Sequence, residues 1–147
     1  MATCRLRVVT PERTVFDQTV NEIITRSVEG ELGILPHHIP IITPLVAHVL
    51  TVYLEDQSVL HLAIAGGFLE VNEQGGLILA DAAESPEEID LPRAEAARDR
   101  AQTRIDQGGE DYDLHRAQRA MARALSRIAV AQDVKSGNRG NAPLLVE

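Results

Sequence analysis

The stretch that decides the fold is Glu29-Gly-Glu-Leu-Gly-Ile-Leu-Pro-His-His-Ile-Pro-Ile-Ile-Thr-Pro-Leu45. Two glycines and three prolines separate its short apolar runs, so the backbone must turn several times while leucine and isoleucine side chains are buried. Because proline lacks the N–H that a central strand donates, the stretch is not a strand in the middle of a sheet. These features predict a corner at which the chain crosses over in an all-β domain.

Alternating polar and apolar residues on both sides of this corner predict strands. Before it, residues 4–9 form one strand, and residues 14–25 resume the pattern with an expected turn at Asp17-Gln18. After it, residues 46–54 and 58–65 are expected to form one hairpin, and residues 68–71 and 77–80 a second.

The paired glycines Gly66-Gly67 fall inside this strand pattern and predict a bulge or the close approach of another segment of chain. Many short strands at this spacing favour a sandwich or a barrel.

Beyond Ser85-Pro86 the apolar period lengthens to helical values. Asp90 is expected to cap a first helix, which Gly108-Gly109 ends before a second helix begins. The two helices are expected to form an antiparallel hairpin with an alanine-rich, low-area seam. The expected organisation is a β domain over residues 1–84, a two-helix domain over residues 85–134 and a disordered tail over residues 135–147. The seam residues are Leu91, Ala94, Ala97, Ala101 and Ile105 with Leu114, Ala117, Met121, Ala124, Ile128 and Ala131.

Composition excludes several classes of function. A net charge of −8 argues against nucleic acid as the main partner, and no apolar run approaches the roughly 20 residues of a membrane span.

A single cysteine, Cys4, excludes an internal disulfide, and a structural thiol is a simpler interpretation than a reactive one. His37-His38 has no third ligand clearly placed beside it, so we expect corner histidines and no metal site. Nucleotide-loop, hydrolase and dithiol motifs are missing.

Charge is distributed unevenly along the chain. Residues 1–84 hold 4 basic and 11 acidic side chains, whereas residues 114–132 hold four arginines and no acid. These arginines share one helical face, because they follow steps of three, four and four. The face is either solvated and partly paired with acids of the first helix, or a docking surface for an acidic partner or a phosphate ligand. The four residues are Arg116, Arg119, Arg123 and Arg127.

Several motifs in order resemble the epsilon subunit of bacterial F-type ATP synthase over residues 3–134. They are Glu31-Leu-Gly-Ile-Leu-Pro, His38-Ile-Pro-Ile-Ile-Thr-Pro-Leu45, Gly66-Gly-Phe-Leu-Glu-Val71, Leu79-Ala-Asp81 and Ile89-Asp-x-x-Arg-Ala94. The resemblance implies a flattened β-sandwich of two mostly antiparallel sheets followed by a two-helix domain. His37 stands where the family usually has glycine, so a local adjustment of the corner is expected.

The resemblance further implies a non-catalytic rotor subunit of the central stalk, peripheral to the cytoplasmic face of the plasma membrane. In the family the sandwich docks on the gamma subunit and the ring of c subunits, which couples proton translocation to ATP synthesis. The mobile hairpin inhibits ATP hydrolysis when it extends toward acidic regions of the alpha and beta catalytic subunits. The docking residues implied for this chain are His38, Arg116, Arg119 and Arg123.

Some bacterial members bind one regulatory ATP in the folded form, and no cofactor is required. The resemblance implies that ATP would stabilise the folded hairpin without being hydrolysed. The simpler interpretation of the motif is that Asp90 only caps its helix and that Arg93 only forms a local pair. The residues that the resemblance assigns to ATP are Glu84, Ile89, Asp90, Arg93, Ala94, Arg123 and Arg127.

An alternative from another class is an autonomous ligand-binding or enzymatic β-domain that carries its helices as an oligomerisation arm. Such a protein needs a concave polar site in the sandwich, and no convergent set of acid, base or metal ligands is found in the sequence for one.

Overall fold

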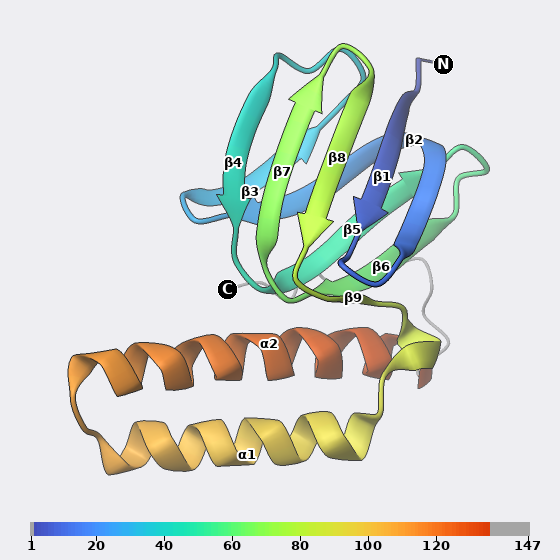
Figure 1. Cartoon of the computed structure of the whole chain (residues 1–147). Coiled ribbons are helices and arrows are strands. Elements are labelled where there is room, and N and C mark those ends of the chain that lie inside the picture. The colour runs from blue at the N-terminus through green and yellow to red at the C-terminus, as the bar shows by residue number, and fades with distance from the viewer. Residues whose placement is uncertain (1, 136–147) are drawn as a thin grey trace.

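The computed structural model describes residues 2–135, and the long strand β2 (Thr14–Ser27) organises its β domain. The first half of β2 pairs antiparallel with β1 (Cys4–Val9), and the second half pairs with β3 (Gly30–Ile34) and β5 (His48–Leu54). β2 therefore belongs to both layers of the sandwich (Figure 1). The expected turn at Asp17-Gln18 is wrong: the strand runs through it, and Asp17 accepts two hydrogen bonds of 2.8 Å from Arg5 on β1.

The other strands complete two crossed layers (Figure 1). One layer contains β1 with β8 (Gly75–Ala80), β7 (Gly67–Asn72) and β4 (Ile41–Leu45). The second layer contains β3, β5, β6 (Val59–Ile64) and the short β9 (Ala83–Glu84). Every pair is antiparallel except β1 with β8.

The predicted corner lies between the layers. β3 pairs with β2 in the second layer, and β4 pairs with β7 in the first, so the chain changes layer between Ile34 and Ile41. Pro44 lies within β4, where β7 is the partner along the whole strand and β2 pairs only at Leu45. Because β4 is close to an edge strand, it tolerates a residue without an N–H.

The core is aliphatic apart from Phe16, as the scarcity of aromatic residues requires. Alternate residues of each strand point inward, which gives the period of two that predicted these strands. The largest fully buried side chains of the β domain are Leu6, Val8, Val20, Ile23, Ile34, His48, Leu50, Val52, Ile64, Leu69 and Ile78.

The surroundings of Gly67 show why this residue of the Gly66-Gly67 pair must be glycine. Its φ is +140°, and a Cβ built there would lie 2.0 Å from the carbonyl oxygen of Leu79 on β8. Only glycine permits this approach of β7 and β8, so the expected close contact between chain segments is confirmed.

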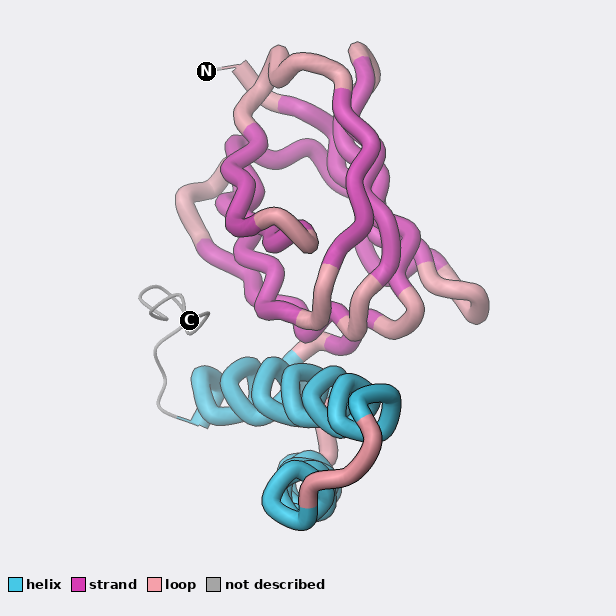
Figure 2. Tube along the Cα trace, turned by 90° about the vertical axis from the view of Figure 1, so that its left-hand side faces the viewer, coloured by secondary structure: helices cyan, strands magenta, loops and turns pink. Residues whose placement is uncertain are grey.

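Two helices follow the sandwich. α1 (Leu91–Gln107) and α2 (Asp111–Lys135) pack antiparallel beneath one end of the β domain, and α2 lies between α1 and the strands (Figures 1 and 2). Ala94 and Ala101 of α1 are buried, as the seam required. On α2, Ala117, Ala124, Ile128 and Ala131 are buried as well. The predicted all-β domain followed by a helical hairpin is confirmed.

A single 3-10 turn, η1 (Pro86–Glu88), joins β9 to α1. The backbone N–H of Ser85 donates to Glu88 Oε1 at 3.2 Å, and the N–H of Glu88 donates to the Ser85 carbonyl at 3.0 Å. Glu88 also forms an ion pair with Arg13, which precedes β2. These contacts fasten the linker to the β domain.

The expectation of a disordered tail falls, from residue 136 onward, outside the described residues. Within residues 2–135, neither helix combines the length and the hydrophobicity that crossing a bilayer demands.

Candidate functional site

A cavity of about 370 Å³ lies where the helical hairpin meets the edge of the sandwich. Its β-domain wall comes from the end of β6 and the segment leading to β9, and its helical wall comes from the middle of α1 and α2. Small side chains leave the space open, since alanines line both walls. The apolar lining residues are Ala63, Ile64, Ala65, Ala82, Ala97, Ala101, Ala120 and Ala124.

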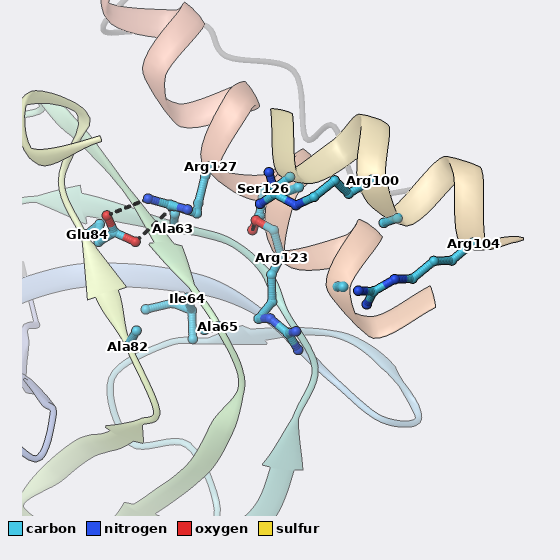
Figure 3. A pocket seen from close by; sticks show the side chains of 14 residues that line it. Ala63, Ile64, Ala65, Ala82, Glu84, Arg100, Arg104, Arg123, Ser126 and Arg127 are labelled. Atoms are coloured by element: carbon cyan, nitrogen blue, oxygen red, sulfur yellow. Dashed lines mark hydrogen bonds and ion pairs between the residues drawn. The ribbon is translucent and has the colours of Figure 1, made fainter. Parts of the chain in front are cut away.

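Four arginines and one carboxylate supply the charge of this cavity. Arg100 and Arg104 come from α1, Arg123 and Arg127 come from α2, and Glu84 comes from β9 (Figure 3). With a single carboxylate against four guanidinium groups, the cavity is strongly positive. Guanidinium groups make forked hydrogen bonds to phosphate, so the cavity suits a phosphate-bearing ligand with a small apolar part.

Arg127 and Glu84 form a two-contact ion pair across the cavity wall. Arg127 Nε lies 3.0 Å from Glu84 Oε1, and Arg127 Nη2 donates to Glu84 Oε2 at 3.3 Å. The Nε atom is buried and its direction to Oε1 falls outside that of a hydrogen bond, so this contact is ionic only. The pair joins the β domain directly to α2.

The structure brings together only part of the residue set implied for ATP. Glu84, Arg123 and Arg127 line the cavity, whereas the four residues of the Ile89–Ala94 motif do not. Asp90 is the N-cap of α1, and its Oδ1 accepts a 3.1 Å hydrogen bond from the Arg93 backbone N–H. The capping interpretation of Asp90 is therefore the one that its contacts match.

The other motif residues have different surroundings. Ala94 is fully buried, Ile89 is half-buried at the end of η1, and the Arg93 side chain is exposed. The sequence interpretation missed Arg100 and Arg104. A signal for them existed, because Arg93, Arg100 and Arg104 follow helical steps of seven and four that place all three on one face.

A second cavity of about 610 Å³ lies between the N-terminal half of α2 and the loops at the same end of the sandwich. Arg119 and Arg123 line it from the helix, and Asp81 and Val28 line it from the β domain. Arg123 therefore borders both cavities. Arg116 is exposed and lines neither. Of the four arginines of this face, Arg127 is half-buried, whereas Arg116, Arg119 and Arg123 are exposed.

The remaining implied docking residue, His38, belongs to the corner between β3 and β4. Figure 1 shows this corner at the end of the sandwich away from the helices. His38 borders a cavity of about 400 Å³ there, next to Leu35 and Ile39, whose side chains are mostly exposed. His37 adopts a φ of 66°, the left-handed region that favours glycine. His37 therefore adopts a backbone conformation that glycine favours, and the expected local adjustment of the corner stays a prediction.

An exposed apolar patch covers the outer face of the first layer. Phe68 on β7 lies directly opposite Pro44 on β4 and Leu79 on β8, so the three side chains share one side of the sheet. Ile42 lies two residues before Pro44 and belongs to the same face. Ile42, Phe68 and Leu79 are 74%, 55% and 51% exposed. A contiguous apolar surface of this kind is typical of a protein interface.

His48 is a buried neutral base between the layers. Its Nδ1 donates to the Val46 carbonyl at 2.7 Å, so its Nε2 accepts from the Thr25 hydroxyl, also at 2.7 Å. The pKa of His48 is lowered to about 4, mainly by burial; the Val46 hydrogen bond opposes this shift and the positive Arg26 adds to it. Cys4 is half-buried, and burial raises the pKa of its thiol, which makes it a weaker nucleophile.

No cluster of three or more metal-ligating side chains occurs among the described residues. The described residues thus present an exposed apolar sheet face and an arginine-lined cavity beneath a helical hairpin.

Comparison with known proteins identifies the family. Residues 3–86 match the family described as ATP synthase, Delta/Epsilon chain, beta-sandwich domain, and residues 87–132 match the corresponding long alpha-helix domain. The chain belongs to the ATP synthase epsilon-chain family and is a non-catalytic subunit. The resemblance found in the sequence is confirmed, and the alternative of an autonomous enzymatic β-domain is set aside.

Bacterial relatives cover most of both chains. The ATP synthase epsilon chain of Desulforamulus reducens is 40% identical over 130 residues, which are 88% of this chain and 98% of that one. The epsilon chain of Alkalihalophilus pseudofirmus is 44% identical over 111 residues, or 76% and 83% of the two chains.

A solved structure shares the fold. A chain in the Euglena gracilis mitochondrial ATP synthase has a TM-score of 0.70 and 23% sequence identity, with 93% of this chain and 82% of that chain covered.

Proposed function

We propose that this chain is a rotor subunit of the ATP synthase central stalk, which couples proton translocation to ATP synthesis and restrains ATP hydrolysis through its hairpin. Its place is the cytoplasmic face of the bacterial plasma membrane, peripheral to the bilayer. Membership of the epsilon family supports this role, as does the Tetrahymena thermophila chain of similar fold, which comes from a central stalk and c-ring structure (TM-score 0.54, 12% identity).

In this proposal the apolar patch of Ile42, Pro44, Phe68 and Leu79 docks on the gamma subunit. Its exposed apolar side chains are neighbours on one face of the sheet, and their burial would stabilise a complex. The corner around His38 faces the c ring from the opposite end to the helices, where Leu35 and Ile39 offer further apolar contacts.

The observation that carries the regulatory part is the arginine-lined cavity between hairpin and sandwich. Both walls are needed to form it, so it exists only while the hairpin is folded. A ligand that occupies the cavity therefore stabilises the folded state in proportion to its affinity for it. ATP fits the chemistry, with phosphates for the arginines and a planar base for the alanine-lined wall. Once released, the hairpin exposes its arginines to acidic regions of the alpha and beta subunits and inhibits hydrolysis.

Calorimetry of the full chain tests this proposal. We expect ATP to raise the unfolding temperature of the helical transition without being hydrolysed, and Arg127→Gln to abolish the rise. Arg116→Gln is the matched control, because Arg116 is on the same helix but does not line the cavity. An unfolding profile of the unmodified chain that ATP does not shift would contradict the ligand part and leave the subunit assignment in place.

A further inference from the structure

We propose that the second cavity, between α2 and the loops of the sandwich, receives two side chains of the subunit that docks on the apolar patch, one apolar and one a carboxylate. The docked subunit then touches both domains of the chain and holds the hairpin in its folded state. The inference rests on the proposed docking of gamma, and it adds to that docking a contact with the helical domain.

The second cavity is continuous with the apolar patch. Pro44, Phe68 and Leu79 form one row across β4, β7 and β8 on the outer face of the first layer. Figure 1 shows the end of β4 and the start of β7 on the side of the sandwich that faces α2. Two positions from the row on each chain, in that direction, the residues that line the cavity are Val46, Gly66 and Asp81. A protein surface that covers the patch therefore reaches the cavity as well.

The two walls of the cavity differ in chemistry. The β-domain wall is mainly apolar, and Val28 is 58% exposed, so part of this wall is open to solvent. The helical wall is positive, because Arg119 and Arg123 lie four residues apart on one face of α2. The apolar lining residues are Val28, Leu45, Val46, Ala47 and Ala65 from the β domain and Ala122 from α2.

The charges of the cavity have no partner within the described part of the chain. Neither Arg119 nor Arg123 takes part in an ion pair there, and neither does Asp81, which is the one carboxylate among the lining residues. Two guanidinium groups and one carboxylate leave a positive charge, which attracts a carboxylate of the partner. An apolar side chain next to that carboxylate gains by covering the alanine and valine wall.

Contact with both walls couples docking to the state of the hairpin. One wall belongs to α2, so the cavity is lost when the hairpin leaves the sandwich. A subunit bound to both walls favours the folded hairpin by the ratio of its affinities for the folded and released states. By reciprocity, release of the hairpin weakens the binding of that subunit by the same factor.

Hydrogen exchange of the α2 amides tests the inference, measured without nucleotide on the full chain with and without purified gamma subunit. Bound gamma is expected to slow exchange along α2 about fivefold or more, because couplings of this kind start near that value. A subunit that touches only the patch would protect β4, β7 and β8 and leave α2 unchanged.

Two variants alter the helical wall in different ways. Arg119→Glu reverses one charge, and Ala122→Phe fills space in the cavity without changing the charge. Each is expected to weaken the binding of gamma about tenfold and to remove the protection of α2. Arg116→Glu and Leu125→Phe are the matched controls, because both residues are exposed on α2 and line neither of the two cavities beside the hairpin. Exchange without gamma shows whether each variant keeps its hairpin folded.

The outcomes keep this inference apart from the docking on which it rests. If gamma binds the unmodified chain and α2 exchanges as fast as it does without gamma, the cavity contact is overturned while docking on the patch stands. If Arg119→Glu and Ala122→Phe bind gamma as their controls do, the role of the cavity is overturned as well. If gamma does not bind the unmodified chain, the proposed docking fails and the cavity contact fails with it.

Discussion

Arg127 on α2 and Glu84 on β9 face each other through two contacts, of 3.0 and 3.3 Å, which join the second helix to the last strand of the sandwich. The side chains are 26% and 27% exposed, so water screens them less than it screens an ordinary surface pair. The Arg5–Asp17 and Arg7–Asp17 contacts, in contrast, lie within the β domain.

Replacing Glu84 with Gln should loosen the hairpin. The pair contributes about 1 kcal/mol, so opening of α2 should become about fivefold more frequent. Hydrogen exchange of the α2 amides measures this opening. Asp17→Asn is the matched control, because it breaks the Arg5–Asp17 pair within the sandwich and should leave α2 unchanged. Equal exchange in α2 for Glu84→Gln and the unmodified chain would contradict the role of the pair.

His48 should make the β domain less stable in mild acid. Its pKa is about 4 in the folded state, below the value of about 6.5 for an unfolded histidine, so the unfolded state binds more protons between these values. The contribution is fully present above pH 6.5, declines as the pH falls to 4 and is lost below that. It amounts to about 3 kcal/mol at most.

Urea unfolding between pH 4 and pH 8 measures this loss, and His48→Gln should flatten the decline. His38→Gln is a control at a half-buried corner histidine outside the core. The prediction fails if His48→Gln and the unmodified chain lose stability in parallel.

His37→Gly should stabilise the protein by about 0.5–1 kcal/mol. A left-handed non-glycine residue costs about 1–2 kcal/mol, which exceeds the entropy that glycine adds to the unfolded chain. Gln57→Gly should act in the same direction, since Gln57 has a φ of 73°. His38→Gly, at a residue without positive φ, should destabilise. Denaturant midpoints of the three variants distinguish conformational strain from a general effect of glycine.

Phe68→Glu should prevent co-purification with the gamma subunit and leave the isolated chain folded. Phe68 is 55% exposed at the centre of the apolar patch, so a charge there would be desolvated only on docking. Leu125→Glu is the matched control, since Leu125 is 50% exposed but lies on α2. Normal recovery of gamma with Phe68→Glu would place the interface elsewhere.

Local patterns were sufficient to predict β1, β2, β5, β6, β7, β8, the helical hairpin and the corner, because period, glycine and proline act within a few residues. The short strands β3 and β4 at the corner, and β9, were not predicted, because they depend on pairing with distant strands. The turn expected at Asp17-Gln18 failed because a residue on another strand, Arg5, pairs with Asp17 and makes a continuous strand favourable. The cavity was harder to predict for a related reason. Asp90 and Arg93 were assigned to the ligand because they belong to a contiguous motif. Arg100 and Arg104 line the cavity because one helix packs on the other, and this packing could not be deduced from a motif.

The fastening of η1 has a consequence for how fast a released hairpin returns. Glu88 is held by Ser85 and Arg13, so only Ile89 and Asp90 separate the anchored linker from α1. Two extended residues span about 7 Å. Because this connection is so short, a released hairpin pivots about the linker. It also stays at a high effective concentration next to the surface of the β domain on which it packs. In the proposed mechanism, a catalytic subunit that binds the helices therefore competes with an intramolecular partner that is always near.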